Sequence, residues 1–500
     1  MADYDAIVIG AGNGGLAASV TLAKSGAKTL LLERHNIPGG CATSFVRGRF
    51  EFEVALHQLS GIGTEAFPGP LRGTLNDLGV ADELELVQME NLYRAVSPGN
   101  YDVTLKADRS LSIAALKERF PHESDNIDRF FDLIWEYCNQ WIHVMFMRDP
   151  ESSPEKYPIY FKYALKPMQA VLDQYLSDTT LQTIVGMYWS YLGMPPRRLP
   201  FGEFAVVLWA YTEFKPWHIK GGSQTLSNAL LNRFLSDGGD VQFCCGAKKI
   251  GVQDGRVVSV VAEHGDEITT DRVISNASTY ATYVDLLDQS LVPESRWKEL
   301  GARNVGVSAV TLFIGFDAEP DQLGIRETTN FLTSASDSNQ VWEDSHTLNP
   351  PRSMLFSCYD VDDPGFSPPG CSQAALISLA YAEPWLRVPP HQYHDTKYRI
   401  AEQMLELLYR VFPDCRDHIE ELDVGTPLTH MRYLGHPGGA IYGFDQATQD
   451  TELFIDKSSP IKGLYHTGAW VASGGFQPTL MSGASTARLA LRSLKSRRDK

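Results

Sequence analysis

The sequence contains no Cys-x-x-Cys pair, and its seven cysteines are scattered and odd in number. A redox-active dithiol, a zinc site and a disulfide framework are therefore not indicated, and we expect no metal. No stretch approaches 18 consecutive apolar residues, so no segment is expected to span a membrane. Asp3 and Asp5 precede only a short apolar run, which does not resemble a signal peptide. We expect a cytoplasmic protein and leave peripheral membrane contact open.

Positive charge is also scarce. The chain has 44 Lys and Arg against 61 Asp and Glu, which gives a net charge of -17. Nucleic acid binding needs clustered cations, so a nucleic acid partner is not expected. The 500 residues, 43% of them hydrophobic, are enough for two or three domains with a large core.

The most informative segment is DAIVIGAGNGGLAASVTLAKSGAKTLLLE, residues 5–33. A buried-type strand leads into three spaced glycines, then an Ala/Leu-rich helix and a second strand. Gly10 permits the tight turn, Gly12 lets the backbone approach a pyrophosphate, and Gly15 lets helix and strand pack closely. The helix N-terminus attracts the phosphates. Glu33 ends the second strand, where its carboxylate can bind ribose hydroxyls and would repel a 2′-phosphate. This order of elements predicts a dinucleotide site.

The sequence contains no second dinucleotide-binding fingerprint of strand, spaced glycines, helix and acidic residue. The pairs Gly221-Gly222 and Gly238-Gly239 lack the third glycine and the acid. A separate nicotinamide-binding domain is therefore not expected. An external electron donor or acceptor would be needed, unless the reaction is redox-neutral.

Motifs near both ends resemble a known superfamily. Residues 5–15, 31–33 and 39–40 resemble the FAD-binding head of the flavin amine-oxidase and phytoene-desaturase superfamily. Residues 41–57 look more specifically like carotenoid isomerases and retinol saturases. The segments GTPLT (425–429), GGAIYG (438–443) and 463–483 are similar to the same branch.

The resemblance implies non-covalent FAD, with residues 468–483 passing beside the isoalloxazine ring. The residues there fit this implication. A strand ends at Gly468, and a helix is expected to begin near Pro478 with free N–H groups. The expected cofactor-binding residues are Gly10, Gly12, Asn13, Gly14, Gly15, Glu33, Arg34, Gly39, Gly40, Ala42, Thr43, Gly468, Ala469, Gly475, Pro478 and Thr479. One departure is Gly468-Ala469-Trp470, which lacks the acidic residue that many flavoproteins place there to hold the ribityl chain.

The expected fold class is α/β. A Rossmann-type, glutathione-reductase-like FAD-binding domain (1–78, 218–290 and 455–500) is interleaved with a mixed α+β substrate-binding domain (79–217 and 291–454) that carries a helical cap. We predict helices over 126–147, over 160–175 with a break at Pro167, and over 181–192.

Aromatic and Met side chains are dense in the predicted cap. Each of them taken singly is typical of a plain helical core, but together they exceed one helix face, which favours the lining of a long apolar tunnel or a membrane-dipping surface. The set comprises Phe130, Phe131, Trp135, Trp141, Met145, Phe146, Tyr188, Trp189, Tyr191, Trp209 and Trp217.

Five polar residues are candidates for the neighbourhood of the flavin: His57, Glu53, Arg432, His436 and Tyr442. We take His57, Arg432 and Tyr442 as the candidate catalytic groups. The ordinary pKa of His, about 6.5, suits proton transfer, and a buried structural His is the alternative. The loop carrying Arg432 and Tyr442 lies towards the active site in the family that the chain resembles.

We therefore expect an FAD-dependent oxidoreductase acting on carbon–carbon double bonds of a long apolar polyene, which is carotenoid-like, retinoid-like or a polyketide. Saturation, desaturation and cis–trans isomerisation all stay open. The alternatives are an amine-oxidase-like enzyme and a non-enzymatic escort protein that carries flavin.

Overall fold

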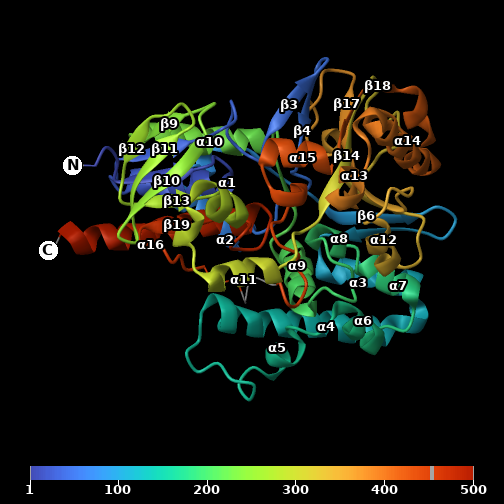
Figure 1. Ribbon diagram of the computed structural model, residues 1–500. Helices are drawn as coiled ribbons and strands as arrows, with labels where there is room; N and C mark the ends of the chain where they lie inside the picture. Colours follow the sequence, from blue (N-terminus) through green and yellow to red (C-terminus); the bar gives the residue numbers. More distant parts are fainter. Residues whose placement is uncertain (1, 451–454, 456, 499–500) are drawn as a thin grey trace.

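The computed structural model describes residues 2–450, 455 and 457–498. Its two largest sheets, of five and seven strands, lie beside a layer of helices (Figure 1). The first sheet has five parallel strands in the order β19-β13-β1-β2-β9. Its strands are β1 (Ala6–Ile9), β2 (Thr29–Leu32), β9 (Asp240–Gln242), β13 (Val273–Ser275) and β19 (Leu464–His466). This is the parallel sheet of a Rossmann-type domain.

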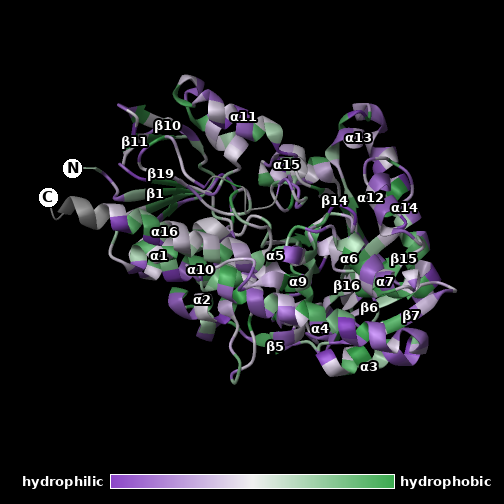
Figure 2. Cartoon of the chain, turned by 90° about the horizontal axis from the view of Figure 1, so that it is seen from below, coloured by the Kyte–Doolittle hydropathy of each residue, from purple (hydrophilic) through white to green (hydrophobic). Residues whose placement is uncertain are grey.

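Both faces of the parallel sheet are covered, as its uninterrupted apolar strands require. On one face, Ala6 and Val8 pack against the helices α1 (Asn13–Lys24), α10 (Ser223–Ser236) and α16 (Phe476–Arg498). On the other, Ile7 and Ile9 pack against a three-stranded sheet of β10 (Ala247–Gln253), β11 (Arg256–Ala262) and β12 (Glu267–Thr269). Figure 2 shows the apolar strands between these two layers.

The second sheet has seven strands in the order β18-β14-β17-β16-β15-β6-β7. All neighbouring strands are antiparallel except β15 and β6, which run parallel. Its strands are β6 (Asn91–Ser97), β7 (Tyr101–Lys106), β14 (Ser308–Phe316), β15 (Thr329–Thr333), β16 (Ser353–Cys358), β17 (Ser372–Ala380) and β18 (Ile419–Gly425). One face packs on α14 (Tyr393–Val411) through Ile400, Met404 and Leu408.

A layer of helices forms the cap. Its members are α3 (Arg109–Arg119), α4 (Ser124–Trp141), α5 (Pro158–Tyr163), α6 (Met168–Tyr175), α7 (Thr179–Val185), α8 (Trp189–Leu192) and α9 (Phe201–Glu213). A π-helical turn, Ile142–Phe146, continues α4. The predicted break at Pro167 is confirmed, because Pro167 lies in the gap between α5 and α6 and caps α6.

The remaining elements connect these layers. They are the hairpin β3 (Ser44–Arg47) and β4 (Phe50–Glu53), the paired strands β5 (Leu86–Gln88) and β8 (Trp217–Ile219), and the helices α2 (Pro70–Leu78), α11 (Glu294–Ala302), α12 (Ser338–Asp344), α13 (Ala382–Leu386) and α15 (Pro427–Leu434). The division into the two sets of domain ranges stays a prediction, and residues 1, 451–454, 456 and 499–500 of those ranges lie outside the described residues.

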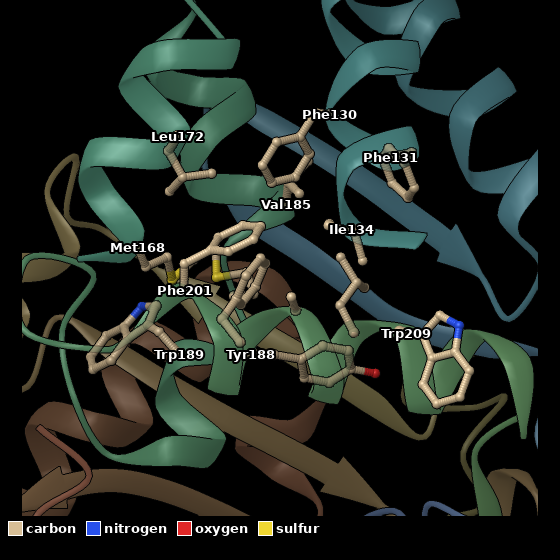
Figure 3. Packing of buried hydrophobic residues seen from close by; sticks show 14 of the residues in the cluster. Phe130, Phe131, Ile134, Met168, Leu172, Val185, Tyr188, Trp189, Phe201 and Trp209 are labelled. Atoms are coloured by element: carbon tan, nitrogen blue, oxygen red, sulfur yellow. The ribbon is translucent and has the colours of Figure 1, made fainter. Parts of the chain in front are cut away.

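The aromatic residues of the cap form a core rather than a tunnel. Phe130 and Phe131 from α4 meet Phe201 and Trp209 from α9, together with side chains from α6 and α7 (Figure 3). Because several helices pack around α4, more than one of its faces is buried. Of the eleven aromatic and Met residues that we considered as a tunnel lining, Trp189 and Tyr191 alone line the cavity described below.

No helix in the described part of the chain is long and apolar enough to cross a bilayer. Phe146 of the set above is instead exposed at the surface.

Asp445 gives the fold a predictable response to pH. Burial raises the pKa of its carboxyl to about 7 from an ordinary 3.8, and Tyr381 Oη donates a 2.8 Å hydrogen bond to it. As the pH rises from 3.8 to 7, the carboxyl loses its proton in the unfolded chain but keeps it in the folded protein. The free energy of unfolding therefore falls over this range by about 4 kcal/mol, at ~1.4 kcal/mol per pKa unit. We expect Asp445→Asn to unfold a few degrees higher than wild type at pH 8 and at the same temperature at pH 4.

Thermal unfolding at both pH values measures this difference. Asp266→Asn, at an exposed position, serves as the matched control and should leave both midpoints unchanged. A difference between Asp445→Asn and wild type that did not vary with pH would contradict the assignment.

Candidate functional site

A cavity of about 1200 Å³ lies at the carboxyl ends of the parallel strands and extends to the seven-stranded sheet. The residues at or just beyond the ends of β1, β2, β13 and β19 line one part of it, and side chains of β14 to β17 line the other. Ligands of open parallel sheets bind at the carboxyl ends of the strands. The two parts are therefore suited to a cofactor and a substrate, respectively.

The N-terminus of α1 faces the first part. Gly12 caps the helix without a side-chain hydrogen bond, and the first turn carries no acidic residue. Asn13 and Gly14 line the cavity there, and Asn13 Oδ1 is buried without a hydrogen-bond partner among the described residues. Free N–H groups at a helix N-terminus bind anions, and an unpaired buried amide indicates a missing ligand. A phosphate-bearing cofactor fits this end.

The glycines of the turn have different roles. Gly10 has a φ of +91°, which other residues rarely adopt. A Cβ on Gly15 would overlap the carbonyl oxygen of Gly10, so Gly15 serves the packing of helix on strand and does not line the cavity. Gly39 forms an isolated parallel bridge with Gly12, which brings the second glycine-rich segment against the first.

Glu33 lies at the tip of β2, 9% exposed. Its Oε2 accepts a 2.6 Å hydrogen bond from the Ala11 N–H, and its Oε1 accepts one of 2.7 Å from the His35 N–H. A carboxylate has about four acceptor sites, so two backbone donors leave capacity for ligand hydroxyls. The neighbouring Arg34 donates from one guanidinium nitrogen to the carbonyls of Arg432 and Tyr433 at the C-terminal end of α15. Arg34 thus joins the cofactor part of the cavity to the loop after α15.

A second helix N-terminus also faces this part. β19 ends at His466, two residues before Gly468, which has a φ of +86°, and α16 begins at Phe476 after Gly475, which has a φ of +100°. Pro478 and Thr479 in the first turn line the cavity. The predicted helix start near Pro478 was therefore two residues late. A planar ring can approach glycine backbone there, and the helix N-terminus favours negative charge.

All but one of the residues predicted to bind the cofactor line this cavity, and the exception is Gly15. Asn276 was missed. It follows β13 directly, and its amide lies against the glycine turn, where a Cβ on Gly14 would be 2.5 Å from Asn276 Oδ1. The position after a parallel strand was the signal that could have identified it.

The second part of the cavity is mainly apolar. Strands of the seven-stranded sheet contribute Phe331, Leu355, Ile377 and Leu379, and the cap contributes Trp189, Tyr191, Leu192 and Val207. Ile377 and Leu379 on the inner strand β17 pack at the edge of the cap core and are partly exposed, because their side chains also face the cavity. No sequence signal distinguished these residues from ordinary core.

His57 and Tyr442 line the cavity together with Arg432. Burial lowers the pKa of His57 to about 4, so the imidazole is neutral at pH 7. Tyr442 packs closely on Gly474, since a Cβ there would overlap its side chain, and burial raises the pKa of its phenol. Arg432 is exposed, with its guanidinium 5.8 Å from the centre of the Tyr433 ring.

The other two polar candidates make internal hydrogen bonds. Glu53 is buried outside the cavity lining, where it accepts hydrogen bonds from the Ser223 N–H (2.6 Å) and hydroxyl (2.7 Å) at the N-terminus of α10. Burial raises its pKa. His436 lines the cavity and bonds through Nδ1 to the Ala440 carbonyl at 2.8 Å. Glu53 is therefore a helix cap rather than a group beside the flavin.

The GTPLT and GGAIYG motifs also have structural explanations. Thr426 and Thr429 form a reciprocal capping box at the start of α15, with Pro427 at the first helical position. The glycines after α15 take positive φ values of 60° at Gly438 and 83° at Gly443. These turns bring Tyr442 back to the cavity.

Comparison with known proteins decides the family. A family model described as flavin containing amine oxidoreductase matches residues 14–491. The chain belongs to this family. The flavoprotein is 27% identical to all-trans-retinol 13,14-reductase of Danio rerio over 97% of this chain and 85% of that relative. It is 25% identical to the chloroplastic prolycopene isomerase of Daucus carota, over 93% of this chain and 76% of that relative.

Solved structures have the same fold. A crystal structure of an oxidoreductase from Methanosarcina mazei matches with a TM-score of 0.66 at 18% sequence identity, covering 97% of this chain and 99% of that chain. Together with the family, this confirms the expected Rossmann-type FAD-binding fold. The protein is an FAD-dependent oxidoreductase.

Proposed function

We propose that this flavoprotein acts on carbon–carbon double bonds of a long apolar polyene. The observation that carries the proposal is the continuity of the cavity, which leads from the glycine-lined cofactor part to the apolar wall of β15 to β17. Burial of apolar surface alone can hold such a substrate, at ~25 cal/mol per Å². The names of the two relatives support it, since one is a retinol reductase and the other a prolycopene isomerase.

We propose that the cofactor-binding residues predicted from the sequence, together with Asn276, hold FAD without a covalent bond. The N-termini of α1 and α16 would stabilise negative charge at the pyrophosphate and at the ring, respectively. Bound FAD supplies a ring that accepts or returns a hydride. The apolar wall orients the polyene against this ring and excludes water from it. Net saturation or desaturation also needs an external electron donor or acceptor.

An amine-oxidase-like activity is less well supported. Tyr191 and Tyr211 both line the cavity, and their ring centroids lie 6.1 Å apart. Aromatic faces of this kind attract ammonium groups, but they also stack on conjugated chains. The acidic residues that line the cavity are Glu33, Asp285 and Asp423, and Arg47 pairs with Asp423 at 2.8 Å. The apolar wall itself carries no carboxylate that would hold an ammonium group.

Anaerobic incubation of the purified holoenzyme with a panel of polyenes tests the proposal. Each polyene is supplied to oxidised and to dithionite-reduced enzyme, and the product is analysed by chromatography and mass spectrometry. A loss of two hydrogens indicates desaturation, a gain indicates saturation, and an unchanged mass with altered retention indicates isomerisation. Peroxide formation with amines and no conversion of any polyene would overturn it. A bound flavin that neither reduces nor reoxidises with any candidate would favour the escort protein.

A further inference from the structure

His57 has a hydrogen-bonding partner that fixes the position of its proton. Its Nδ1 lies 3.1 Å from Tyr359 Oη, and the two rings stack at 21° with centroids 6.4 Å apart. Tyr359 is 1% exposed, and burial raises the pKa of its phenol well above the usual range. Among the described residues, His57 is the one hydrogen-bond acceptor within reach of this phenol. The phenol therefore keeps its proton and donates it to Nδ1, because an unpaired buried O–H costs about 1–3 kcal/mol.

The tautomer of His57 follows from this contact. A neutral imidazole has one protonated nitrogen, so an Nδ1 that accepts a hydrogen bond places the proton on Nε2. His57 Nε2 makes no hydrogen bond with the described residues, and it is not among their buried unpaired atoms. Since His57 lines the cavity, this N–H is open to the cavity. It is a donor of fixed direction at the substrate wall.

The segment that carries this donor brings no ionised side chain to the cavity, and the preceding Glu53 carboxyl is buried outside the cavity lining, where Ser223 donates hydrogen bonds to it. Residues 54–60 carry no ionised side chain, and the adjacent Gln58 carboxamide already bonds the Leu92 carbonyl at 2.5 Å and the Tyr188 hydroxyl at 3.2 Å. A neutral N–H on such a segment suits a neutral oxygen acceptor rather than a carboxylate. A hydrocarbon beside this N–H would leave the donor without an acceptor, which disfavours binding of the hydrocarbon.

We propose that His57, oriented by Tyr359, donates a hydrogen bond from Nε2 to an alcohol or carbonyl oxygen of the substrate. This inference rests on the proposed function and narrows it to oxygen-bearing polyenes. His57 contacts the substrate, and Tyr359 is a positioning residue that acts through it. No proton is transferred in this contact.

Ligand pairs test the proposal on the intact holoenzyme. All-trans-retinol and the hydrocarbon that lacks only its hydroxyl group are titrated separately, and binding is read from difference spectra of the flavin. We expect wild type to bind the alcohol about 3- to 10-fold more tightly, the worth of one neutral hydrogen bond. His57→Leu should bring this ratio close to one, and His57→Gln, which keeps a donor, should retain part of it.

Tyr359→Phe separates positioning from mere packing. We expect a lower ratio of the two affinities and a ¹⁵N NMR spectrum of His57 that shows a mixture of tautomers, whereas wild type shows Nε2–H. Tyr93→Phe is the matched control, because it also removes a buried phenol, one that donates to the Ile184 carbonyl away from the cavity. It should leave both the ratio and the spectrum unchanged.

Two results would overturn the inference while leaving the proposed function intact: equal binding of the alcohol and the hydrocarbon by wild type, or a His57 protonated on Nδ1. Binding of neither polyene would overturn the proposed function, and the inference with it.

Discussion

Gly15→Ala should yield a protein that has lost its FAD. A Cβ at this position would overlap the carbonyl oxygen of Gly10, which belongs to the turn itself. The new Cβ and the Gly10 oxygen cannot move apart freely, because Gly10 directly follows β1 and Gly15 lies in the first turn of α1. Overpacking of this kind costs about 3 kcal/mol, which corresponds to roughly 100-fold weaker cofactor retention.

The flavin-to-protein absorbance ratio after purification measures this loss. Gly73→Ala is the matched control, since a Cβ on Gly73 in the nearby α2 meets no atom within 4 Å. That variant should stay yellow and fold at least as well as wild type, because alanine favours a helix. Wild-type flavin content in Gly15→Ala would show that α1 and the turn can separate without loss of the site.

Ile377→Glu should strongly slow the conversion of an apolar substrate while the flavin remains bound. Ile377 lies on β17 between β14 and β16, and its side chain faces the cavity. A carboxylate at this position is hydrated, and a polyene can bind beside it only if this water is removed. The free energy of that dehydration exceeds the free energy of the lost apolar contact. We expect kcat/KM to fall about 100-fold, equivalent to about 3 kcal/mol.

Two variants at the same position control for size and polarity. Ile377→Leu conserves volume and should stay within a few-fold of wild type, and Ile377→Gln should fall between Ile377→Leu and Ile377→Glu. Steady-state kinetics with the polyene identified above provides the comparison, and the flavin spectrum shows that the cofactor part is intact. Undiminished turnover in Ile377→Glu would mean that the substrate does not lie along this sheet.

The cofactor part of the site was predictable because its determinants are local. Strand, glycine turn, helix and second strand follow one another within residues 5–33, and each is indicated by its own residues. To predict the C-terminal segment of the site, it was enough to recognise the strand before Gly468 and the helix that follows it. The helices α1 and α16 lie where the sequence predicts them, although α16 begins two residues before Pro478.

The substrate part could not be predicted in the same way. A segment as rich in aromatic residues as the one that includes Phe130 and Trp209 is typical of a tunnel lining, yet these side chains fill the interior of the cap. Glu53, a polar candidate for the neighbourhood of the flavin, is instead held by Ser223, 170 residues away. Composition alone does not reveal which faces neighbouring elements cover, because burial depends on packing between distant segments.

The sequence by itself predicted a dinucleotide site at the N-terminal glycine turn and FAD as its occupant, and the family confirms FAD as the cofactor. Only the tertiary structure decided what surrounds the substrate. It placed Ile377 of β17 in the cavity wall and joined His57 to Tyr359 across 302 residues. The reason is physical: a phosphate-binding turn is set by neighbouring residues in the chain, whereas a cavity is the space that packed layers leave between them.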